Sequence, residues 1–561
     1  MLSYDIVIIG GGLAGMRAAI EASKYAQVSL LSKVYPTRSH SGAAQGGLNV
    51  AISAEDSWQS HMFDTVKGSD YLADQAAVEI FCKEAPQAMY DIDNMGLLFD
   101  RKADGTLDQK FTGGATFPRN CFGGDLSGHK ILHTLYEQLL KTGIPVHNEF
   151  SVIKLLTEDN VFQGVVVYDL KHGNIELIRA KAAILVTGGY GQVFLRTTND
   201  AINTGDGMAL AMRAGATLQD MEFVQFHPTT LFGSNILVSE TLRGDGGYLL
   251  NKDGERFMTR YVPTKMELAP RDIVSRSIQS EIREGRGIDG HDYVHLDVAH
   301  LHKSGKLDIM KRFPQVSVIA EKFAGVDIRE QFLPVQPAQH YSMGGVMADV
   351  DGETGIKGLF AAGECACVSV HGANRLGGNS LMDALVFGKR TGIRAGQFAI
   401  ENKLMPLNIA LLNGEKQRIA TIMARTGSQS TPHIRQKLQR IMTDEVGIYR
   451  DAESLQQAML VIEELKKKIS DVMVNDKSQV FNTDLLGYLE LEYLLELSEV
   501  ITIGALQRQE SRGSHFRSDY PKRDDGSWLK HTIASQDKDG KISIGSKPVS
   551  ITSLTPAERK Y

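Results

Sequence analysis

Cysteine, proline and tryptophan are scarce in this chain. It has 561 residues, of which 4 are Cys, 15 are Pro and 2 are Trp. The cysteines are too few and too scattered for a disulfide framework, which favours a reducing compartment. Cys365 and Cys367 form one C-x-C pair without a second pair, so cysteines alone cannot complete a four-ligand zinc or iron–sulfur site. We therefore expect no metal site within the chain.

Long apolar runs and a strong excess of charge are also missing. No run reaches the roughly 18 apolar residues of a transmembrane helix, so we expect none. The first predicted strand begins at Tyr4 and leaves no room for a signal peptide. The chain has 61 basic and 67 acidic residues, a net charge of −6, which does not indicate nucleic acid as the main partner. At 42% hydrophobic residues, it can bury a large core, and its length suggests three or four structural units of about 150 residues each.

Glycine, by contrast, is abundant, with 55 residues, and its most informative cluster lies near the start of the chain. An apolar, β-branched run at Tyr4–Ile9 predicts a buried parallel strand, and Ala14–Tyr25 predicts a helix. The turn between them fits G-x-G-x-x-G, with Gly10 at the tight turn, Gly12 facing a pyrophosphate and Gly15 packing the helix on the strand. The whole fingerprint comprises Gly10, Gly11, Gly12, Leu13, Ala14 and Gly15. It predicts a Rossmann-like α/β fold that binds a dinucleotide.

The second predicted strand, Val28–Leu31, indicates which dinucleotide is bound. An NAD site has an acidic residue about 20 residues after the glycines. Ser32 and Lys33 stand there instead, which favours FAD.

A loop rich in glycine and serine follows, from Arg38 to Gly47. On its residues alone, His40 is either a hydrogen-bonding loop residue or a covalent anchor. The stretch from Ser32 to Gly47 resembles the flavin-linking loop of succinate dehydrogenase and fumarate reductase flavoprotein subunits. Further motifs of this family occur in its order at residues 61–71, 199–207, 225–228, 240–247, 340–345, 358–364, 371–381, 510–515 and 523–525. Together they cover nearly the full chain.

The resemblance implies covalent FAD. In the family, the histidine of the R-S-H triplet is bonded to the 8α-methyl group of FAD, and here that histidine is His40. The other residues that the resemblance, the fingerprint and the loop place on FAD are Ser32, Lys33, Ser39, Ser41, Gln45, Gly46, Gly47, Asp206, Glu364, Ser380 and Leu381.

The predicted architecture is α/β with an inserted domain. A discontinuous FAD-binding domain, residues 1–222 and 339–405, is interrupted by a capping α+β domain at 223–338. A helical domain at 410–520 and a small C-terminal segment at 521–561 follow. Ala183–Val186 reads as a further buried strand, and apolar spacing predicts helices at Leu455–Ile469 and Asp484–Gln509. Asp539-Gly540 is typical of a hairpin turn.

The resemblance also supplies a dicarboxylate site. His227 and Ser239 match the positions that hold one carboxylate, and His340 and Arg375 match those that hold the other. Arginine suits this role because its planar fork binds carboxylates bidentately. Arg271 matches the proton-transferring residue. Its pKa makes it a poor base unless a carboxylate relays the proton, and Glu240 with Arg243 fits that relay.

The electrons taken up by the flavin need a further acceptor outside this chain, because the sequence shows no iron–sulfur ligand set and no C-x-x-C-H haem motif. The resemblance therefore implies a separate iron–sulfur subunit, with membrane anchor subunits and quinone beyond it. The chain would lie on the cytoplasmic face of the cell membrane, held there by these partners. Two positions depart from common family forms: Ser239 stands for Thr, and Thr112 stands where Phe is frequent, with Phe111 beside it.

Three alternatives remain at the level of the sequence. L-aspartate oxidase shares the fold and most substrate residues, but it lacks the R-S-H triplet and binds FAD noncovalently. A flavoprotein that only carries electrons would not need the four matched substrate positions. A soluble single-chain fumarate reductase usually has fused haem or flavin domains, which the sequence does not show.

Overall fold

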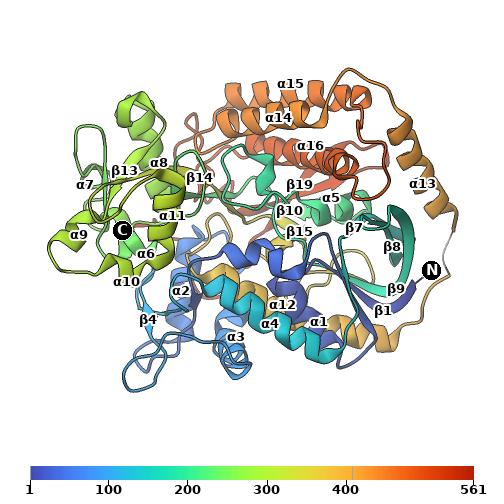
Figure 1. Ribbon diagram of the computed structural model, residues 1–561, viewed down its shortest axis with the longest axis horizontal. Coiled ribbons are helices and arrows are strands. Elements are labelled where there is room, and N and C mark those ends of the chain that lie inside the picture. Colours follow the sequence, from blue (N-terminus) through green and yellow to red (C-terminus); the bar gives the residue numbers. More distant parts are fainter. Residues whose placement is uncertain (1, 407–408, 561) are drawn as a thin grey trace.

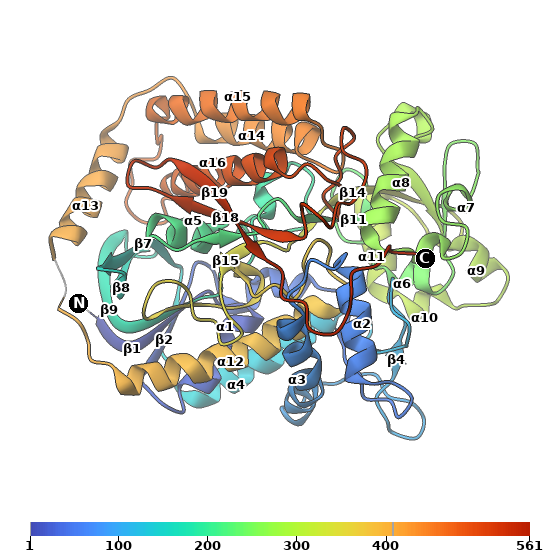
Figure 2. The ribbon, with the colours of Figure 1, turned by 180° about the vertical axis from the view of Figure 1, so that it is seen from behind.

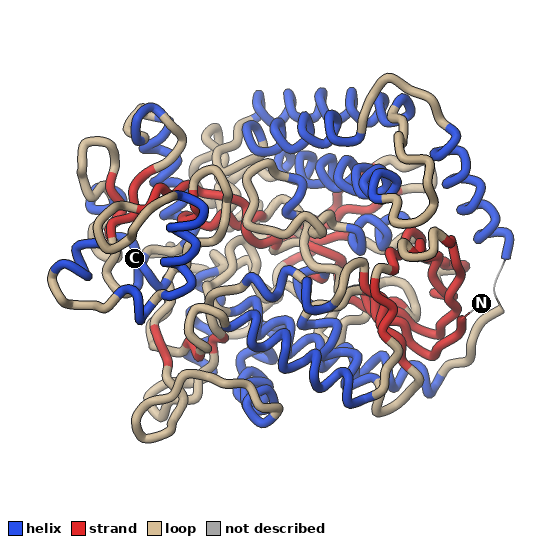
Figure 3. The backbone as a smooth tube through the Cα atoms, viewed as in Figure 1, coloured by secondary structure: helices blue, strands red, loops and turns tan. Residues whose placement is uncertain are grey.

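The computed structural model describes residues 2–406 and 409–560. Residues 1 and 561, the outer ends of the predicted FAD-binding domain and C-terminal segment, lie outside the described residues. The N-terminal Rossmann-like part and the green capping part lie at opposite ends of the long axis in Figure 1, and the orange helices lie along one side. Figure 3 shows the strands running through the middle of the molecule with helices outside them.

The main sheet has the order β6-β2-β1-β9-β8-β7, and β16 pairs with the end of β9. Its parallel part joins β6 (Val146–Asn148), β2 (Val28–Ser32), β1 (Leu2–Ile9), β9 (Asn174–Leu185) and β16 (Leu359–Ala361). Strands β7 (Phe150–Glu158) and β8 (Val161–Asp169) add an antiparallel hairpin beside the first half of β9. Helices α1 (Leu13–Ala22), α4 (Ser127–Thr142) and α12 (Asn379–Glu401) pack together on the sheet, with α2 (Trp58–Gly68) and α3 (Gln75–Asn94) beyond them.

The glycine fingerprint is what joins β1 to α1. Gly10 has a φ of +123°, and a Cβ there would lie 2.3 Å from the carbonyl oxygen of Val186. A Cβ on Gly15 would lie 2.1 Å from the carbonyl oxygen of Gly10. Larger residues at either position would push the helix off the sheet, so the two glycines fix the start of α1 directly over the end of β1.

The inserted part, which is the capping part, is built around the sheet β11-β14-β13-β12. Its strands are β11 (Val224–Leu231), β12 (Tyr248–Leu250), β13 (Val294–Asp297) and β14 (Leu333–Ser342). Its helices are α6 (Thr241–Gly244), α7 (Met258–Tyr261), α8 (Arg271–Arg283), α9 (Ala299–Lys303), α10 (Ile309–Arg312) and α11 (Pro314–Ala324). This part has its own apolar cluster, which includes Leu242, Phe257, Val274, Ile278 and Leu296. Strands β11 and β14 are the two connections to the Rossmann-like part.

The C-terminal third is mainly helical. Helices α14 (Thr431–Glu445), α15 (Ala452–Lys468) and α16 (Thr483–Gln507) pack on one another, and α5 (Asp206–Arg213) packs against α16. Helix α13 (Ile409–Ala424) lies to one side of them and contacts β9 (Figure 1). The hairpin of β18 (Lys530–Gln536) and β19 (Ile542–Pro548) joins β10 (Leu218–Gln219), β15 (Gly345–Met347) and β17 (Ala366–Cys367) in one sheet. Figure 2 shows this hairpin in front of α5 and α16. Short strands β3 (Leu48–Asn49), β4 (Gln109–Lys110) and β5 (Asn120–Cys121) form a further small sheet.

The predicted elements are present, with shifted ends. Helix α1 ends at Ala22 rather than at Tyr25. The N–H groups of Lys24 and Tyr25 bond to the carbonyl oxygens three residues before them, those of Glu21 and Ala22, so the α-helical pattern ends there. Strand β9 extends far upstream of the predicted Ala183, since its more polar first half pairs with β8. Among the described residues, no helix has both the length and the apolar character needed to cross a membrane.

Candidate active site

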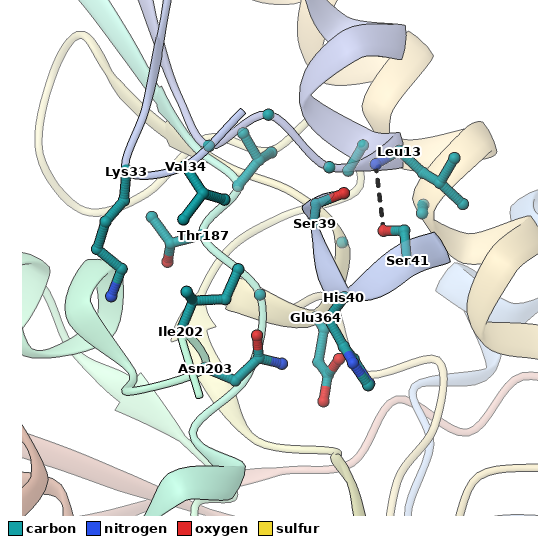
Figure 4. Close-up of a pocket in the computed structure, with 18 of the residues that line it drawn as sticks. Leu13, Lys33, Val34, Ser39, His40, Ser41, Thr187, Ile202, Asn203 and Glu364 are labelled. Atoms are coloured by element: carbon teal, nitrogen blue, oxygen red, sulfur yellow. Dashed lines mark hydrogen bonds between the residues drawn. The ribbon is translucent and has the colours of Figure 1, made fainter. Parts of the chain in front are cut away.

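A long cavity follows the ends of β1, β2 and β9 towards the inserted sheet. Its walls include most of the residues that the sequence places on FAD: Gly10, Gly11, Gly12, Leu13, Ala14, Ser32, Lys33, Ser39, His40, Ser41, Gln45, Asp206, Glu364, Ser380 and Leu381. Gly15 is not in this wall but packs on Gly10. Gly46 and Gly47 line a smaller pocket beside it. Figure 4 shows Lys33 and His40 on opposite sides of the cavity, with Ser39 and Ser41 at the start of α1.

The start of α1 fits a diphosphate. Gly12 faces Ser39 and Ser41, and a Cβ there would lie 3.3 Å from Ser41 Oγ and intrude on the cavity. The N-cap residue Gly12 has no side chain, and the Leu13 backbone N–H donates a long hydrogen bond of 3.4 Å to Ser41 Oγ, drawn in Figure 4. The helix start and this hydroxyl group thus lie together at the cavity wall, an arrangement typical of anion sites at helix N-termini. The buried Oγ of Ser39 and Oε1 of Gln45 have no partner among the described residues. Such buried, unpaired polar atoms are typical of a site that a polar ligand completes.

Lys33 lies at the far end of the cavity. Its Nζ is 2.7 Å from both Asp206 Oδ2 and Glu490 Oε1. Burial alone would lower the pKa of Lys33, but the two carboxylates raise it above its usual range. Asp206 is therefore already paired by Lys33, and Glu490 on α16 holds Lys33 in place without lining the cavity itself.

Glu364 lies near the middle of the cavity. Its Oε1 accepts a hydrogen bond of 2.9 Å from the Ser342 backbone N–H. Burial raises the pKa of Glu364 to about 7. Near neutral pH this side chain can accept or donate hydrogen bonds to ligand hydroxyl groups.

His40 projects from a short 3₁₀ turn, His40–Ala43. The Asp200 backbone N–H donates to His40 Nδ1 over 3.3 Å, and Asn199 Nδ2 lies 3.3 Å from His40 Nε2. Desolvation lowers the pKa of His40, which favours the neutral ring. Two contacts from the 199–200 loop thus orient a neutral imidazole at the cavity wall.

The smaller pocket adjoins the long cavity. Both are lined by Gln45, Leu237, His340, Ser380 and Leu381, so the two spaces meet there. The pocket also brings together most of the predicted substrate and catalytic residues, namely His227, Ser239, Glu240, Arg271, His340 and Arg375.

The two histidines pack against each other edge to face in the pocket wall. The ring centroids of His227 and His340 are 5.0 Å apart. His227 Nδ1 lies 3.0 Å from the Thr229 carbonyl oxygen, and His340 Nδ1 lies 2.8 Å from Thr198 Oγ1. Burial, reinforced by nearby positive groups, holds the pKa of both rings well below the usual value. Both are therefore neutral hydrogen-bonding groups.

Arg271 and Glu240 form a close pair in this pocket. Arg271 Nε donates to Glu240 Oε2 over 2.8 Å, and Glu240 Oε1 accepts from the Gly113 backbone N–H over 2.7 Å. Burial would raise the pKa of Glu240, but the charges of Arg271 and Arg243 hold it far below its usual range. Glu240 is therefore an ionised acceptor that links the inserted part to the loop before β5.

Arg375 is the second guanidinium of the pocket. It is almost fully buried, it lies over the ring of Tyr341 at 4.4 Å, and Nη1 donates to Ser380 Oγ over 3.1 Å. Burial, with the charge of Arg271, lowers its pKa to about 9. Its Nε has no partner among the described residues. An anionic ligand can compensate such a desolvated cation.

Arg243 and Thr112 complete the set of predicted positions. Arg243 is buried behind the pocket, does not line it, and donates from Nη1 to the Glu267 carbonyl oxygen. It acts on Glu240 through its charge. Thr112 does line the pocket, and its buried Oγ1 has no partner among the described residues. Phe111 also lines it but is 54% exposed.

Gln225 is the main residue that the sequence analysis did not place in the site. Its Oε1 accepts from Arg271 Nη1 over 3.2 Å and from Arg375 Nη2 over 3.0 Å. The signal was the alternation of β11, which puts Gln225 and His227 two residues apart on one strand. Gln225 joins the two guanidinium groups without cancelling either charge.

The comparisons with known proteins agree with this arrangement. The model of the FAD binding domain family matches residues 5–381, and that of the fumarate reductase flavoprotein C-terminal family matches residues 435–561. The succinate dehydrogenase flavoprotein subunit of Rickettsia felis is 42% identical over 100% of this chain and 98% of its own. The 8-methylmenaquinol:fumarate reductase flavoprotein subunit of Wolinella succinogenes is 42% identical over 100% of this chain and 93% of its own.

A solved E. coli quinol fumarate reductase chain has a TM-score of 0.96 to this structure, at 38% identity over 100% of this chain and 99% of that one. A match of this extent includes the Rossmann-like part, the inserted part and the helical part together. The chain therefore belongs to the succinate dehydrogenase and fumarate reductase flavoprotein subunits, a family of FAD-dependent oxidoreductases.

Proposed function

We propose that this chain interconverts succinate and fumarate at the pocket between His227, His340, Arg271 and Arg375, beside covalently held FAD. The observation that carries the proposal is the pair of guanidinium groups, bridged by Gln225, next to two neutral histidines. Such a pocket suits a small molecule with two carboxylates and a short, flat carbon chain between them.

The proposed binding mode uses one side of the pocket for each carboxylate. Arg375 and His340 hold one carboxylate, and the unpaired Nε of Arg375 is free to donate to it. His227 and Ser239 hold the other, with Thr112 as an additional hydroxyl. A neutral imidazole carries a single N–H. His227 therefore donates to the substrate from Nε2 when its Nδ1 accepts from the Thr229 backbone N–H over 3.3 Å, and His340 does so when its Nδ1 accepts from Thr198 Oγ1.

FAD, when bound, would supply the hydride acceptor or donor. The residues that would hold it are the β1–α1 turn for the diphosphate, Glu364 for hydroxyl groups and His40 for the covalent link. The cavity supports this assignment through the helix start at its wall, where Leu13 donates to Ser41, and through its unpaired Ser39 and Gln45 oxygens.

Arg271 is the proposed proton carrier. In fumarate reduction its guanidinium donates a proton to the substrate carbon and becomes a neutral guanidine, and in succinate oxidation the neutral guanidine accepts one. Glu240 stabilises the protonated guanidinium through their hydrogen bond and lies on the side from which the proton is replaced. Closure by the capping part would keep water away from this transfer.

We further propose that electrons pass to or from a separate iron–sulfur subunit and the quinone pool, with the chain held peripherally on the cytoplasmic face of the cell membrane. Membership of this family supports both points. Co-purification of the native chain with an iron–sulfur protein from solubilised membranes tests them.

The decisive test is acid precipitation of the native protein, followed by peptide mapping and assays with succinate and L-aspartate. The proposal expects flavin in the pellet, attached to a peptide containing His40, and turnover of succinate with an artificial electron acceptor. Flavin in the supernatant together with turnover of L-aspartate would favour L-aspartate oxidase. Flavin whose spectrum no dicarboxylate perturbs would favour a carrier without a substrate of its own.

A further inference from the structure

The last residues of the chain run from the C-terminal sheet to the capping part. After β19 the chain crosses beside α2 and ends at the green capping elements (Figure 2). Gln75, at the start of α3, fixes this tail: its Oε1 accepts from the backbone N–H groups of Thr552, Ser553 and Leu554 over 2.9–3.0 Å. The tail thus follows a defined path although it has no regular secondary structure.

Arg559 lies at the end of that path between two carboxylates. Its Nη2 donates to Asp272 Oδ2 over 2.6 Å, and its Nε lies 3.3 Å from Asp70 Oδ1. Asp70 follows α2 in the Rossmann-like part, whereas Asp272 is in the first turn of α8 in the capping part. The three side chains are largely buried. One guanidinium therefore bridges two parts of the molecule.

Asp272 directly follows Arg271, the proposed proton carrier. Both lie in the first turn of α8, whose N-cap is Pro270. Asp272 also pairs with Arg276, at 3.3 Å on the same helix. Arg276 moves with α8, so its pairing with Asp272 does not itself fix the helix to the rest of the protein. Its Nη1 does reach the Gly513 carbonyl oxygen over 2.8 Å, one turn further from Arg271.

We propose that Arg559 is a positioning residue: its pairing with Asp272 holds the first turn of α8, and with it Arg271, at the substrate pocket. The inference rests on the proposed function for the role of Arg271. The C-terminal tail thereby holds helix α8 of the capping part in place. Loss of the Arg559 contact would free this helix, which carries Arg271.

The energetic basis is the burial of Asp272. A buried carboxylate that loses its partner is strongly destabilised, so α8 would shift to reach water or another cation. Small displacements of a reacting group are costly, and a change of about 1 Å can lower the rate by about 100-fold. His227, Ser239 and Arg375 are not on α8, so dicarboxylate binding would largely persist.

The test compares Arg559→Met, Asp272→Asn and the double variant in the flavin-loaded protein, with Lys560→Met as the matched control. The side chain of Lys560 is 83% exposed. We expect kcat for succinate to fall by about tenfold or more in each single variant. The fall in the double variant should be no larger, because the two substitutions remove the same interaction. Binding of malonate, followed by the flavin spectrum, should change less than about threefold. Arg559→Lys should recover part of kcat.

Hydrogen exchange gives a second readout that needs no turnover. The amides of the first turn of α8 should exchange faster in Arg559→Met and Asp272→Asn, and as in wild type in Lys560→Met. Unchanged kcat and exchange, or losses that add in the double variant, would overturn the inference. A fall in malonate affinity that matches the fall in kcat would also overturn it. If Arg559→Met does not accumulate, Asp272→Asn decides alone, because it leaves the tail bound to Asp70.

The two proposals fail in different ways. If the wild-type protein does not turn over succinate, the proposed function is wrong, and exchange at α8 still tests the bridge. If the wild type is active and the Arg559 variants match it, the bridge alone is wrong.

Discussion

Arg271 Nε and Glu240 Oε2 lie 2.8 Å apart, and the same carboxylate accepts from the Gly113 backbone through its other oxygen. Arg271 begins α8, Glu240 precedes α6, and Gly113 lies in the loop before β5. One carboxylate thus fixes the direction of the guanidinium and also ties the capping part to the loop beneath it. The geometry favours Arg271 as a directed proton carrier.

The first prediction compares the loss of the Arg271 guanidinium with the loss of the negative charge on Glu240. Arg271→Ala should keep malonate binding within about tenfold but lower kcat for succinate by about 1,000-fold or more, because the proposed proton carrier is lost. Glu240→Gln should be milder, since the amide oxygen can still accept from Arg271 or Gly113. Steady-state kinetics with a binding titration check both. Arg329→Ala, at an exposed arginine of the capping part, is the control, and substantial activity in Arg271→Ala would refute the assignment.

The second prediction concerns Gln225. Gln225→Leu should lower kcat/KM for succinate by about 100-fold, because hydrogen bonds to two charged groups are lost in a buried site. Gln225→Glu should instead raise KM, since its carboxylate would compete with the substrate for Arg271 and Arg375. The exposed Gln331→Leu should leave the kinetics unchanged. If Gln225→Leu behaves like this control, Gln225 does not organise the guanidinium groups.

Local patterns predicted the parts of the fold and site that depend on neighbouring residues. The turn at Gly10 and Gly15 follows from backbone sterics within one β–α unit, and it specified the Rossmann-like start. The family motifs indicated His227 and Arg375, which do line one pocket.

Contacts between distant segments were not predictable in the same way. Lys33 pairs with Glu490, 457 residues away, and Arg559 pairs with Asp272 across 287 residues. No local sequence pattern predicts either pairing, because each depends on how whole domains pack. Gln225 is intermediate: strand alternation places it beside His227, but only the fold brings Arg375 to it.

The third prediction concerns His40. His40→Ala should bind FAD noncovalently and lose succinate oxidation by more than fumarate reduction, since the covalent link raises the flavin potential by family analogy. Acid precipitation, redox titration and both directional assays check this. Tyr35→Ala, at an exposed residue before the same loop, should keep the covalent flavin. Equal succinate turnover in His40→Ala and wild type would contradict the role.

The fourth prediction concerns a buried histidine far from the pocket. His531 on β18 has Nδ1 2.6 Å from Asp220 Oδ2 and Nε2 3.2 Å from Asp74 Oδ1. Burial would lower its pKa, but the two carboxylates raise it from 6.5 to about 9. Because the folded-state pKa exceeds the unfolded one, its contribution is fully present below about pH 6.5 and is lost as the pH rises through about 9. The shift corresponds to a contribution on the order of 3 kcal/mol.

His531→Gln should therefore lower the thermal unfolding midpoint most near pH 6, where it removes the charged partner of the buried Asp220, whereas Asp74 keeps Lys547 Nζ at 3.6 Å. The difference from wild type should shrink steadily towards pH 9.5, where the wild-type ring is neutral as well. Thermal unfolding of both proteins at matched flavin content, across this pH range, measures it. His172→Gln is the control, because His172 is 60% exposed beside Asp169 and such surface pairs contribute little. A difference that is independent of pH would show that the His531 ring packs as a neutral group, with no charge shared between Asp220 and Asp74.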